Sequence, residues 1–181
     1  MIRTFLAVDF DGPFLDDVAA LAERLRSDPR LSAARWAPRE TLHATLRFFG
    51  DTSDAQVAAL RAFVQELAAG TASIAVRAPW VHGFPARARA NVLVLDVAAG
   101  ELASLATRAE ARAVSLGFAA ESRPYHAHLT LARMRKAVDV SSLAPEAAAL
   151  PSGRVAAITL YASSSSPSGA VYTPLERVTL P

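Results

Sequence analysis

The sequence contains no cysteine and almost no lysine. Without cysteine the chain can form neither disulfides nor thiolate metal sites. Lys136 is the single lysine, so 18 of the 19 basic residues are arginine. Arginine suits bidentate phosphate binding, but the composition bias of an alanine-rich chain explains the same excess. The formal net charge of +2 does not favour a protein that wraps long nucleic acid.

Long apolar segments are missing as well. No run of residues reaches the length of a transmembrane helix, and residues 1–9 lack the apolar core and cleavage site of a signal peptide. We therefore expect a cytoplasmic protein. With 181 residues, 52% of them hydrophobic and 20% charged, the chain is expected to form a single globular domain over 1–181.

The pattern His-x-Thr-Leu occurs twice, at residues 43–46 and 128–131. Each copy lies in a short stretch with alternating apolar residues, which predicts a β-strand over about 41–49 and another over about 126–134. Side chains two residues apart on a strand share a face, so each strand should present one imidazole beside one hydroxyl. A half-buried structural histidine explains a single copy well, but two copies are improbable by chance.

Two histidines and two threonines fit a displacement at phosphorus. The attacking and leaving oxygens lie roughly in line, so one imidazole can accept a proton while the other donates one. Histidine suits both roles because its ordinary pKa lies near neutral pH, and threonine hydroxyls can hold the phosphate oxygens. Arg47 shares the face of His43 and Thr45 by strand parity, which makes it a candidate phosphate ligand or an exposed strand arginine.

Other chemistries remain open or are excluded by the residues. His126 and His128 are two residues apart on one predicted strand face, so a third histidine could complete a zinc site. Against this, no carboxylate stands at ligand spacing beside either motif, and threonine is a poor zinc ligand. The sequence has no Gly-x-Ser-x-Gly nucleophile motif and no phosphate-binding P-loop. We therefore expect neither metal nor cofactor.

The order of predicted elements contains a weak internal repeat. A strand, a helix and a motif strand occur over 2–49 and again over 91–134, with the two motifs 85 positions apart. Ser53 and Gln56 form a capping-box pattern before a helix that ends at Gly70. The remaining predictions are a strand over 73–78, a turn-prone stretch over 80–89, a connector over 136–153 and a C-terminal hairpin over 154–180.

The paired motifs resemble those of the 2H phosphoesterases, and within them the bacterial RNA 2′,3′-cyclic phosphodiesterases, also called 2′-5′ RNA ligases. The resemblance covers nearly the whole chain. It implies an α+β fold of two pseudo-symmetric lobes of antiparallel sheet, with helices outside and a central groove. The segments that carry it lie at 3–7, 35–36, 43–50, 83–85, 123–125, 128–133 and 160–172.

The resemblance also implies an activity and residue roles. The activity is hydrolysis of a 2′,3′-cyclic phosphate of RNA or a nucleotide to a 2′-phosphate, without metal or cofactor, and in reverse a 2′-5′ ligation. By analogy His43 donates a proton to the leaving oxygen and His128 accepts one from water. Thr45 and Thr130 would hold the phosphate. Arg133 matches a family arginine and is a further candidate phosphate ligand, although parity places it on the face opposite His128 unless a bulge intervenes.

Further residues could contact a base or an RNA strand. Tyr125 and Phe84 could stack on bases, and Arg87 and Arg89 could contact phosphates. The chain departs from the family at Ala127, where proline is common, and at Tyr125, where phenylalanine is common. The alternatives are a nucleotide or RNA-end binding module without turnover, or a structural domain. No long coiled-coil pattern is visible, so we expect a monomer.

Overall fold

The computed structural model describes residues 1–143, 150–166 and 169–181. It is an α+β protein whose strands form one connected, mainly antiparallel arrangement. The helices are α1 (Gly12–Arg26), α2 (Asp54–Ala69) and α3 (Gly100–Ser115), with short 3-10 helices at Pro29–Leu31, Arg39–Thr41 and Arg87–Arg89. The strands are β1 (Ile2–Phe10), β2 (Arg35–Trp36), β3 (Ala44–Thr52), β4 (Ala75–Arg77), β5 (Val81–Phe84), β6 (Ala90–Asp96), β7 (His128–Val138), β8 (Ser152–Ser166) and β9 (Gly169–Thr179).

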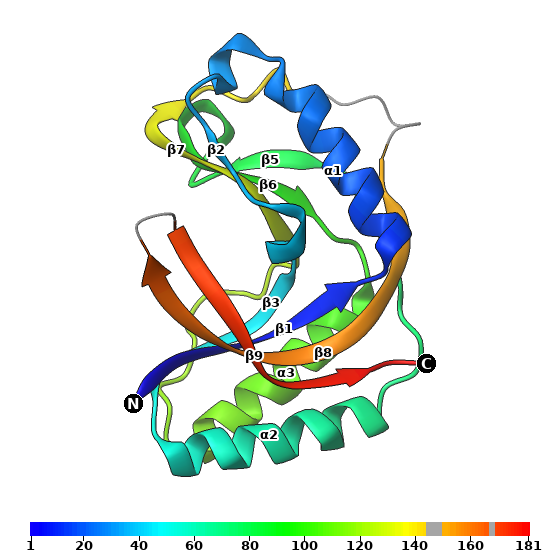
Figure 1. Ribbon diagram of the computed structural model, residues 1–181, viewed down its shortest axis with the longest axis vertical. Helices are drawn as coiled ribbons and strands as arrows, with labels where there is room; N and C mark the ends of the chain where they lie inside the picture. Colours follow the sequence, from blue (N-terminus) through cyan, green and yellow to red (C-terminus); the bar gives the residue numbers. More distant parts are fainter. Residues whose placement is uncertain (144–149, 167–168) are drawn as a thin grey trace.

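The central strands follow a mirrored order. Reading across the sheet, β8-β1-β3 is followed by β7-β6-β5, so the two motif strands β3 and β7 are neighbours at the centre. They pair antiparallel at a single position, Ala44 with Leu129, and then run apart into the two halves of the molecule. Figure 1 shows the helices on the outside of these strands. The predicted fold of two related lobes is confirmed.

The motif strands meet in an arrangement that the repeat alone did not predict. The two strands begin side by side at one seam of the sheet. Each then enters its own lobe, where β1 pairs with β3 and β6 pairs with β7. The first residues of both motifs therefore lie near the seam.

Helices α1 and α2 begin at side-chain caps, whereas α3 begins after Ala99 without one. The Asp11 side chain accepts a hydrogen bond from the Phe14 amide at the start of α1, and Ser53 and Gln56 form the predicted capping box at the start of α2. Helix α2 packs against β8 and β9, while α3 packs against β3. Helix α3 of the second repeat thus packs in the first lobe, and β2 of the first repeat pairs with β7, so each lobe contains elements from both repeats.

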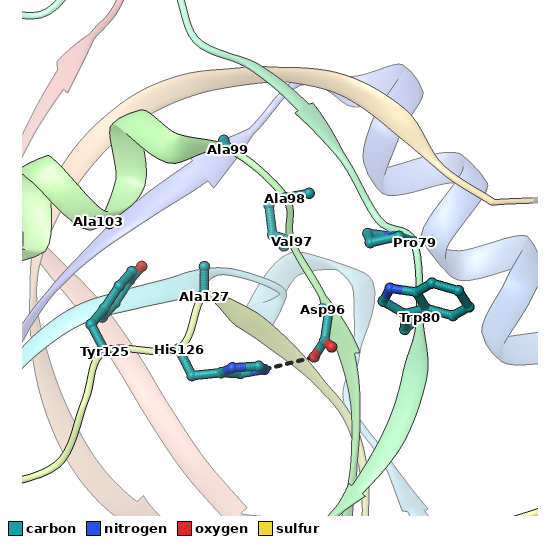
Figure 2. Close-up of a pocket in the computed structure, with 10 residues that line it drawn as sticks. All are labelled: Pro79, Trp80, Asp96, Val97, Ala98, Ala99, Ala103, Tyr125, His126 and Ala127. Atoms are coloured by element: carbon teal, nitrogen blue, oxygen red, sulfur yellow. Dashed lines mark hydrogen bonds and ion pairs between the residues drawn. The ribbon is translucent and has the colours of Figure 1, made fainter.

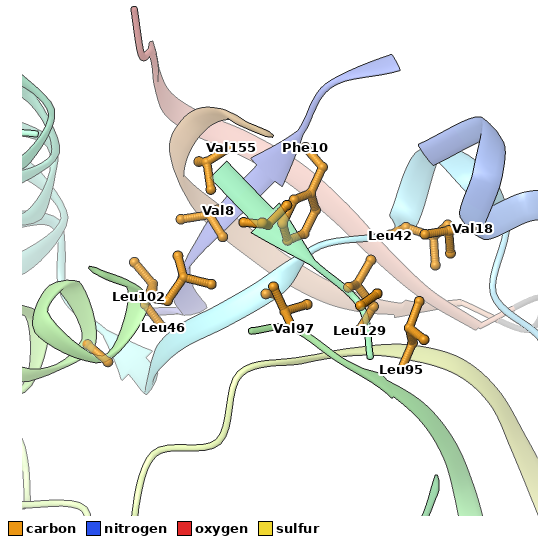
Figure 3. Close-up of a cluster of buried hydrophobic side chains, with 14 of the residues drawn as sticks. Val8, Phe10, Val18, Leu42, Leu46, Leu95, Val97, Leu102, Leu129 and Val155 are labelled. Carbon is orange, nitrogen blue, oxygen red and sulfur yellow. The ribbon is translucent and has the colours of Figure 1, made fainter. Parts of the chain in front are cut away.

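The core continues from one lobe into the other. Figure 3 shows apolar side chains from β1, β3, β6, β7 and β8 in one cluster. Each large apolar side chain buried in this way contributes about 1.5–3 kcal/mol relative to exposure. The fully or nearly fully buried members include Val8, Phe10, Val18, Leu42, Leu46, Leu95, Val97, Leu102, Leu129 and Val155.

Several predicted boundaries differ from the structure. Strand β3 starts at Ala44 rather than near 41 and continues through Gly50, whose φ is +75°. The turn-prone stretch 80–89 contains β5, because Val81 to Phe84 pair with β6 despite the neighbouring proline. The predicted connector over 136–153 lies partly outside the described residues. Within the part of the chain that the structure describes, no helix is both long and apolar enough to cross a membrane.

Candidate active site

The two motif histidines make the same main-chain contact. The Nδ1–H of His43 donates to the carbonyl oxygen of Thr41 over 2.8 Å, and the Nδ1–H of His128 donates to that of His126 over 2.8 Å. This bond fixes the tautomer, so the neutral ring has its lone pair on Nε2. Each ring can therefore accept a proton at Nε2, or donate one from there when it is charged.

Burial lowers the pKa of both histidines. For His43, desolvation is the largest cause, and the bond to the Thr41 carbonyl and the charge of Asp9 oppose it. For His128, desolvation again dominates, and the nearby His126 and His82 rings lower its pKa further. Asp96 acts in the opposite direction on His128. Both rings thus favour the neutral form, the form in which either can act as a base.

The surroundings of the two rings differ. His43 lies among aromatic side chains, with ring centroids 5.0 Å from Phe5 and 5.2 Å from Tyr172. His128 lies 5.4 Å from the Phe84 ring and 5.8 Å from the His126 ring. An apolar setting around one imidazole and a histidine-rich setting around the other give the pair unequal electrostatic environments.

Both motif strands contain a bulge at the leucine that follows the threonine. In the first lobe Thr45 pairs with Ala7, but the next pair is Arg47 with Leu6, which skips Leu46. In the second lobe Thr130 pairs with Val94, but the next pair, Ala132 with Leu93, skips Leu131. A bulge of this kind inverts the parity of the residues that follow.

The first bulge corrects the prediction for Arg47. Directly paired residues share a sheet face, and Leu6 is adjacent to Ala7, the partner of Thr45, so Arg47 lies on the face opposite Thr45 and His43. Its guanidinium pairs with Glu110 on α3 over 2.5 Å and also donates to the carbonyls of Phe48 and Ala119. It lines the edge of the cavity described below, and two of its terminal nitrogens already donate to carbonyl oxygens.

The second bulge has the opposite effect on Arg133. Before the bulge the buried side chains of β7 are Leu129 and Leu131, and after it they are Ala132 and Met134. Arg133 therefore lies on the exposed face. Arg133 pairs with Val92 on β6 and with Arg35 on β2. Val92 lines the cavity, so Arg133 and Arg35 lie on the groove side. Within the described residues neither arginine has an ion pair, and Arg35 was not among the predicted site residues.

A cavity of about 780 Å³ lies beside the second motif. Thr45 and His128 both line it, together with the predicted base contacts Tyr125 and Phe84. The Tyr125 hydroxyl is buried with no hydrogen-bond partner among the described residues, and burial raises its pKa. His43 and Thr130 are not among the lining residues, although Thr130 is half-buried on the groove face of β7.

The predicted RNA contacts Arg87 and Arg89 are not brought to this cavity. Arg87 donates to the carbonyls of Ser141 and Leu143, and the cavity lining as described includes neither arginine. Their 3-10 helix, Arg87–Arg89, joins β5 to β6 at the outer edge of the sheet. A role for them in binding a substrate at the motif histidines therefore has no geometric support.

Two aspartates occupy equivalent places in the lobes and were missed by the sequence analysis. Asp9 is two residues beyond the β1 partner of Thr45, and Asp96 is two residues beyond the β6 partner of Thr130. Asp9 accepts hydrogen bonds from Thr159, Tyr161 and Arg177. Asp96 instead contacts His82 and His126. The signal in the sequence was an apolar strand ending in aspartate before each motif.

Comparison with known proteins gives one consistent result. A family model described as "LigT like Phosphoesterase" matches residues 8–94 and 95–172, one match for each repeat. An RNA 2′,3′-cyclic phosphodiesterase of Methanothermobacter thermautotrophicus is 29% identical over 181 residues, covering 97% of either chain. A protein with the same name from Bacillus subtilis is 28% identical over 109 residues, covering 60% of either chain.

Solved structures share the fold over nearly the whole chain. A Thermus thermophilus protein matches with a TM-score of 0.81 and 24% identity, covering 99% of this chain and 98% of that one. Escherichia coli LigT complexed with 3′-AMP matches with a TM-score of 0.73 and 26% identity, over the same shares of the two chains.

Proposed function

Because this chain belongs to the LigT-like phosphoesterase family, we propose that it hydrolyses 2′,3′-cyclic phosphate ends of RNA or nucleotides to 2′-phosphates. The observation that carries the proposal is the matched pair of histidines, each with Nδ1 bonded to a carbonyl and Nε2 left for chemistry. Relatives named RNA 2′,3′-cyclic phosphodiesterase, and a LigT complex with 3′-AMP, support the substrate class.

In the proposed mechanism His43 is the acid and His128 is the base. Neutral His128 takes a proton from water as the water oxygen bonds to phosphorus. Charged His43 gives its Nε2 proton to the 3′ oxygen as the P–O3′ bond breaks, which leaves a 2′-phosphate and a 3′-hydroxyl. The assignment is the one that the family resemblance implies; a carboxylate favours the charged form of each ring, Asp9 for His43 and Asp96 for His128.

The threonines and two arginines complete the proposed site. Thr45 and Thr130 donate hydrogen bonds to the non-bridging phosphate oxygens. Arg35 and Arg133 are opposed on β2 and β7, where two like charges repel unless an anion lies between them. A backbone phosphate of a longer RNA supplies that anion. With a 5′-hydroxyl in place of water, the same displacement would form a P–O5′ bond as the P–O3′ bond breaks and would give a 2′-5′ linkage at the same site.

The test is hydrolysis of a 2′,3′-cyclic nucleotide in excess EDTA, with identification of the product phosphate. We expect a 2′-phosphate from the unmodified protein and a loss of at least about 10²-fold in each of His43→Ala and His128→Ala. Arg61→Ala, on the exposed side of α2, is the matched control and should retain full activity. Loss of turnover in EDTA would contradict the metal-free mechanism, and binding without turnover would indicate a binding module.

A further inference from the structure

Three potential metal ligands converge beside His128 from three separate segments of the chain. They are His82 on β5, Asp96 at the end of β6 and His126 in the loop before β7. One ligand atom from each residue lies within 4.8 Å of the other two. His126 Nε2 is 2.8 Å and His82 Nδ1 is 3.0 Å from Asp96 Oδ1. Figure 2 shows the imidazole of His126 directed at the Asp96 carboxylate.

The equivalent aspartate in the other lobe shows what this cluster lacks. Asp9 is paired with the permanently charged guanidinium of Arg177, over 3.2 Å. Asp96 is only 17% exposed, and among the described residues its ionic partners are two imidazoles, which carry charge only when protonated. A largely buried carboxylate without a permanent cation is costly. A bound cation would supply the missing charge.

We propose that His82, Asp96 and His126 bind a divalent transition-metal ion of the zinc class. Two imidazole nitrogens and one carboxylate oxygen form a donor set that Zn²⁺ accepts in open, three-ligand sites. The imidazoles already lie at hydrogen-bonding distance from the carboxylate, so a metal ion replaces the shared protons without rearranging the strands. His126 has a side chain that is 49% exposed, which gives the ion a path of entry.

The proposed site is separate from the acid–base pair. The sequence suggested His126 and His128 as joint ligands, but the structure gathers His82 and Asp96 around His126 and leaves His128 outside the group. His128 Nδ1 is already bonded to the His126 carbonyl. Metal at this cluster is therefore not required for the proposed hydrolysis, and its binding can be measured without substrate.

The experiment is calorimetric titration of tag-free protein with Zn²⁺, using His82→Gln, Asp96→Asn and the matched control His43→Ala. We expect one Zn²⁺ per chain, with affinity reduced at least about tenfold in His82→Gln and Asp96→Asn and unchanged in His43→Ala. Zn²⁺ should also raise the melting temperature of the unmodified protein but not that of His82→Gln. Circular dichroism of each variant verifies that it is folded.

A second probe identifies the ligands. Bound Co²⁺ should give visible absorption bands in the unmodified protein and in His43→Ala, and these bands should be lost in His82→Gln. Absence of binding at millimolar Zn²⁺ would overturn the proposal. So would binding that is lost in His43→Ala or His128→Ala and kept in His82→Gln, because the metal would then occupy the catalytic pair.

Discussion

At the scale of single residues, each motif histidine donates a hydrogen bond to a main-chain carbonyl two residues earlier, but the side chains around the two rings differ. The carbonyls of Thr41 and His126 fix both tautomers in the same way. Asp9 then acts on His43, while His126, His82 and Asp96 act on His128. The motifs themselves are nearly identical, so any difference between the two rings comes from these neighbours.

This environment predicts an acidic pH optimum for the free enzyme. Hydrolysis needs one charged and one neutral imidazole, and burial lowers the pKa of both below the ordinary value of about 6.5. As pH rises above the lowered pKa of the acid, its proton is lost and the rate falls. We expect kcat/KM for a cyclic mononucleotide to peak below about pH 6.5. A peak above about pH 6.5 would contradict this reasoning.

The two bulges predict different consequences for two arginines. Arg47→Ala removes the ion-pair partner of Glu110 and two hydrogen-bond donors, so we expect an unfolding free energy lower by about 1–3 kcal/mol. Arg133→Ala removes an exposed side chain, so stability should change by no more than about 0.5 kcal/mol. The KM of the Arg133→Ala variant should rise for an RNA of several nucleotides and remain unchanged for a cyclic mononucleotide. Urea unfolding measures the stability of both variants, and steady-state kinetics on the two substrates measure the KM of Arg133→Ala. Equal effects on the two substrates would contradict a contact between Arg133 and the longer RNA.

At the scale of elements, α1 and α2 begin at side-chain caps that are visible in the sequence. Ser53 Oγ accepts a hydrogen bond from the Gln56 amide, and the Gln56 side chain accepts one from the Ser53 amide. Ser53→Ala should therefore lower stability by about 1 kcal/mol and the melting temperature by about 2–4 °C. Thermal unfolding measures the change, with Ser53→Thr as the conservative control. An unchanged melting temperature would show that packing alone holds the start of α2.

Local signals predicted the elements that contain them, and non-local pairing determined the rest. The strand of Ile2–Phe10, the helix after Gly12 and the capping box were all readable from neighbouring residues. Strand β5 was missed because its residues stand beside glycine and proline, and only pairing with β6 makes them a strand. The bulges at Leu46 and Leu131 arise between strands distant in sequence, so parity failed for Arg47.

At the scale of the whole molecule, the resemblance predicted the fold and the pair of motifs, but it did not predict which strands belong to which lobe. The sequence showed a repeat of strand, helix and motif strand. The structure adds that β5 from the first half completes the second lobe and that β8 from the second half completes the first. The Asp9 and Asp96 clusters depend on that exchange, because Thr159 and His82 come from β8 and β5. No short window of sequence contains either cluster.

The exchange of strands also sets the order in which the protein can be completed during synthesis. Strand β1 lies between β3 and β8, and β8 begins only at Ser152. A nascent chain therefore exposes one edge of its first strand until most of the chain has left the ribosome. Pairings so distant in sequence form slowly, and an open strand edge invites association with other chains. The first lobe contains the N-terminal strand β1, yet it is completed only after β8 and β9, the last strands of the chain, have been synthesised.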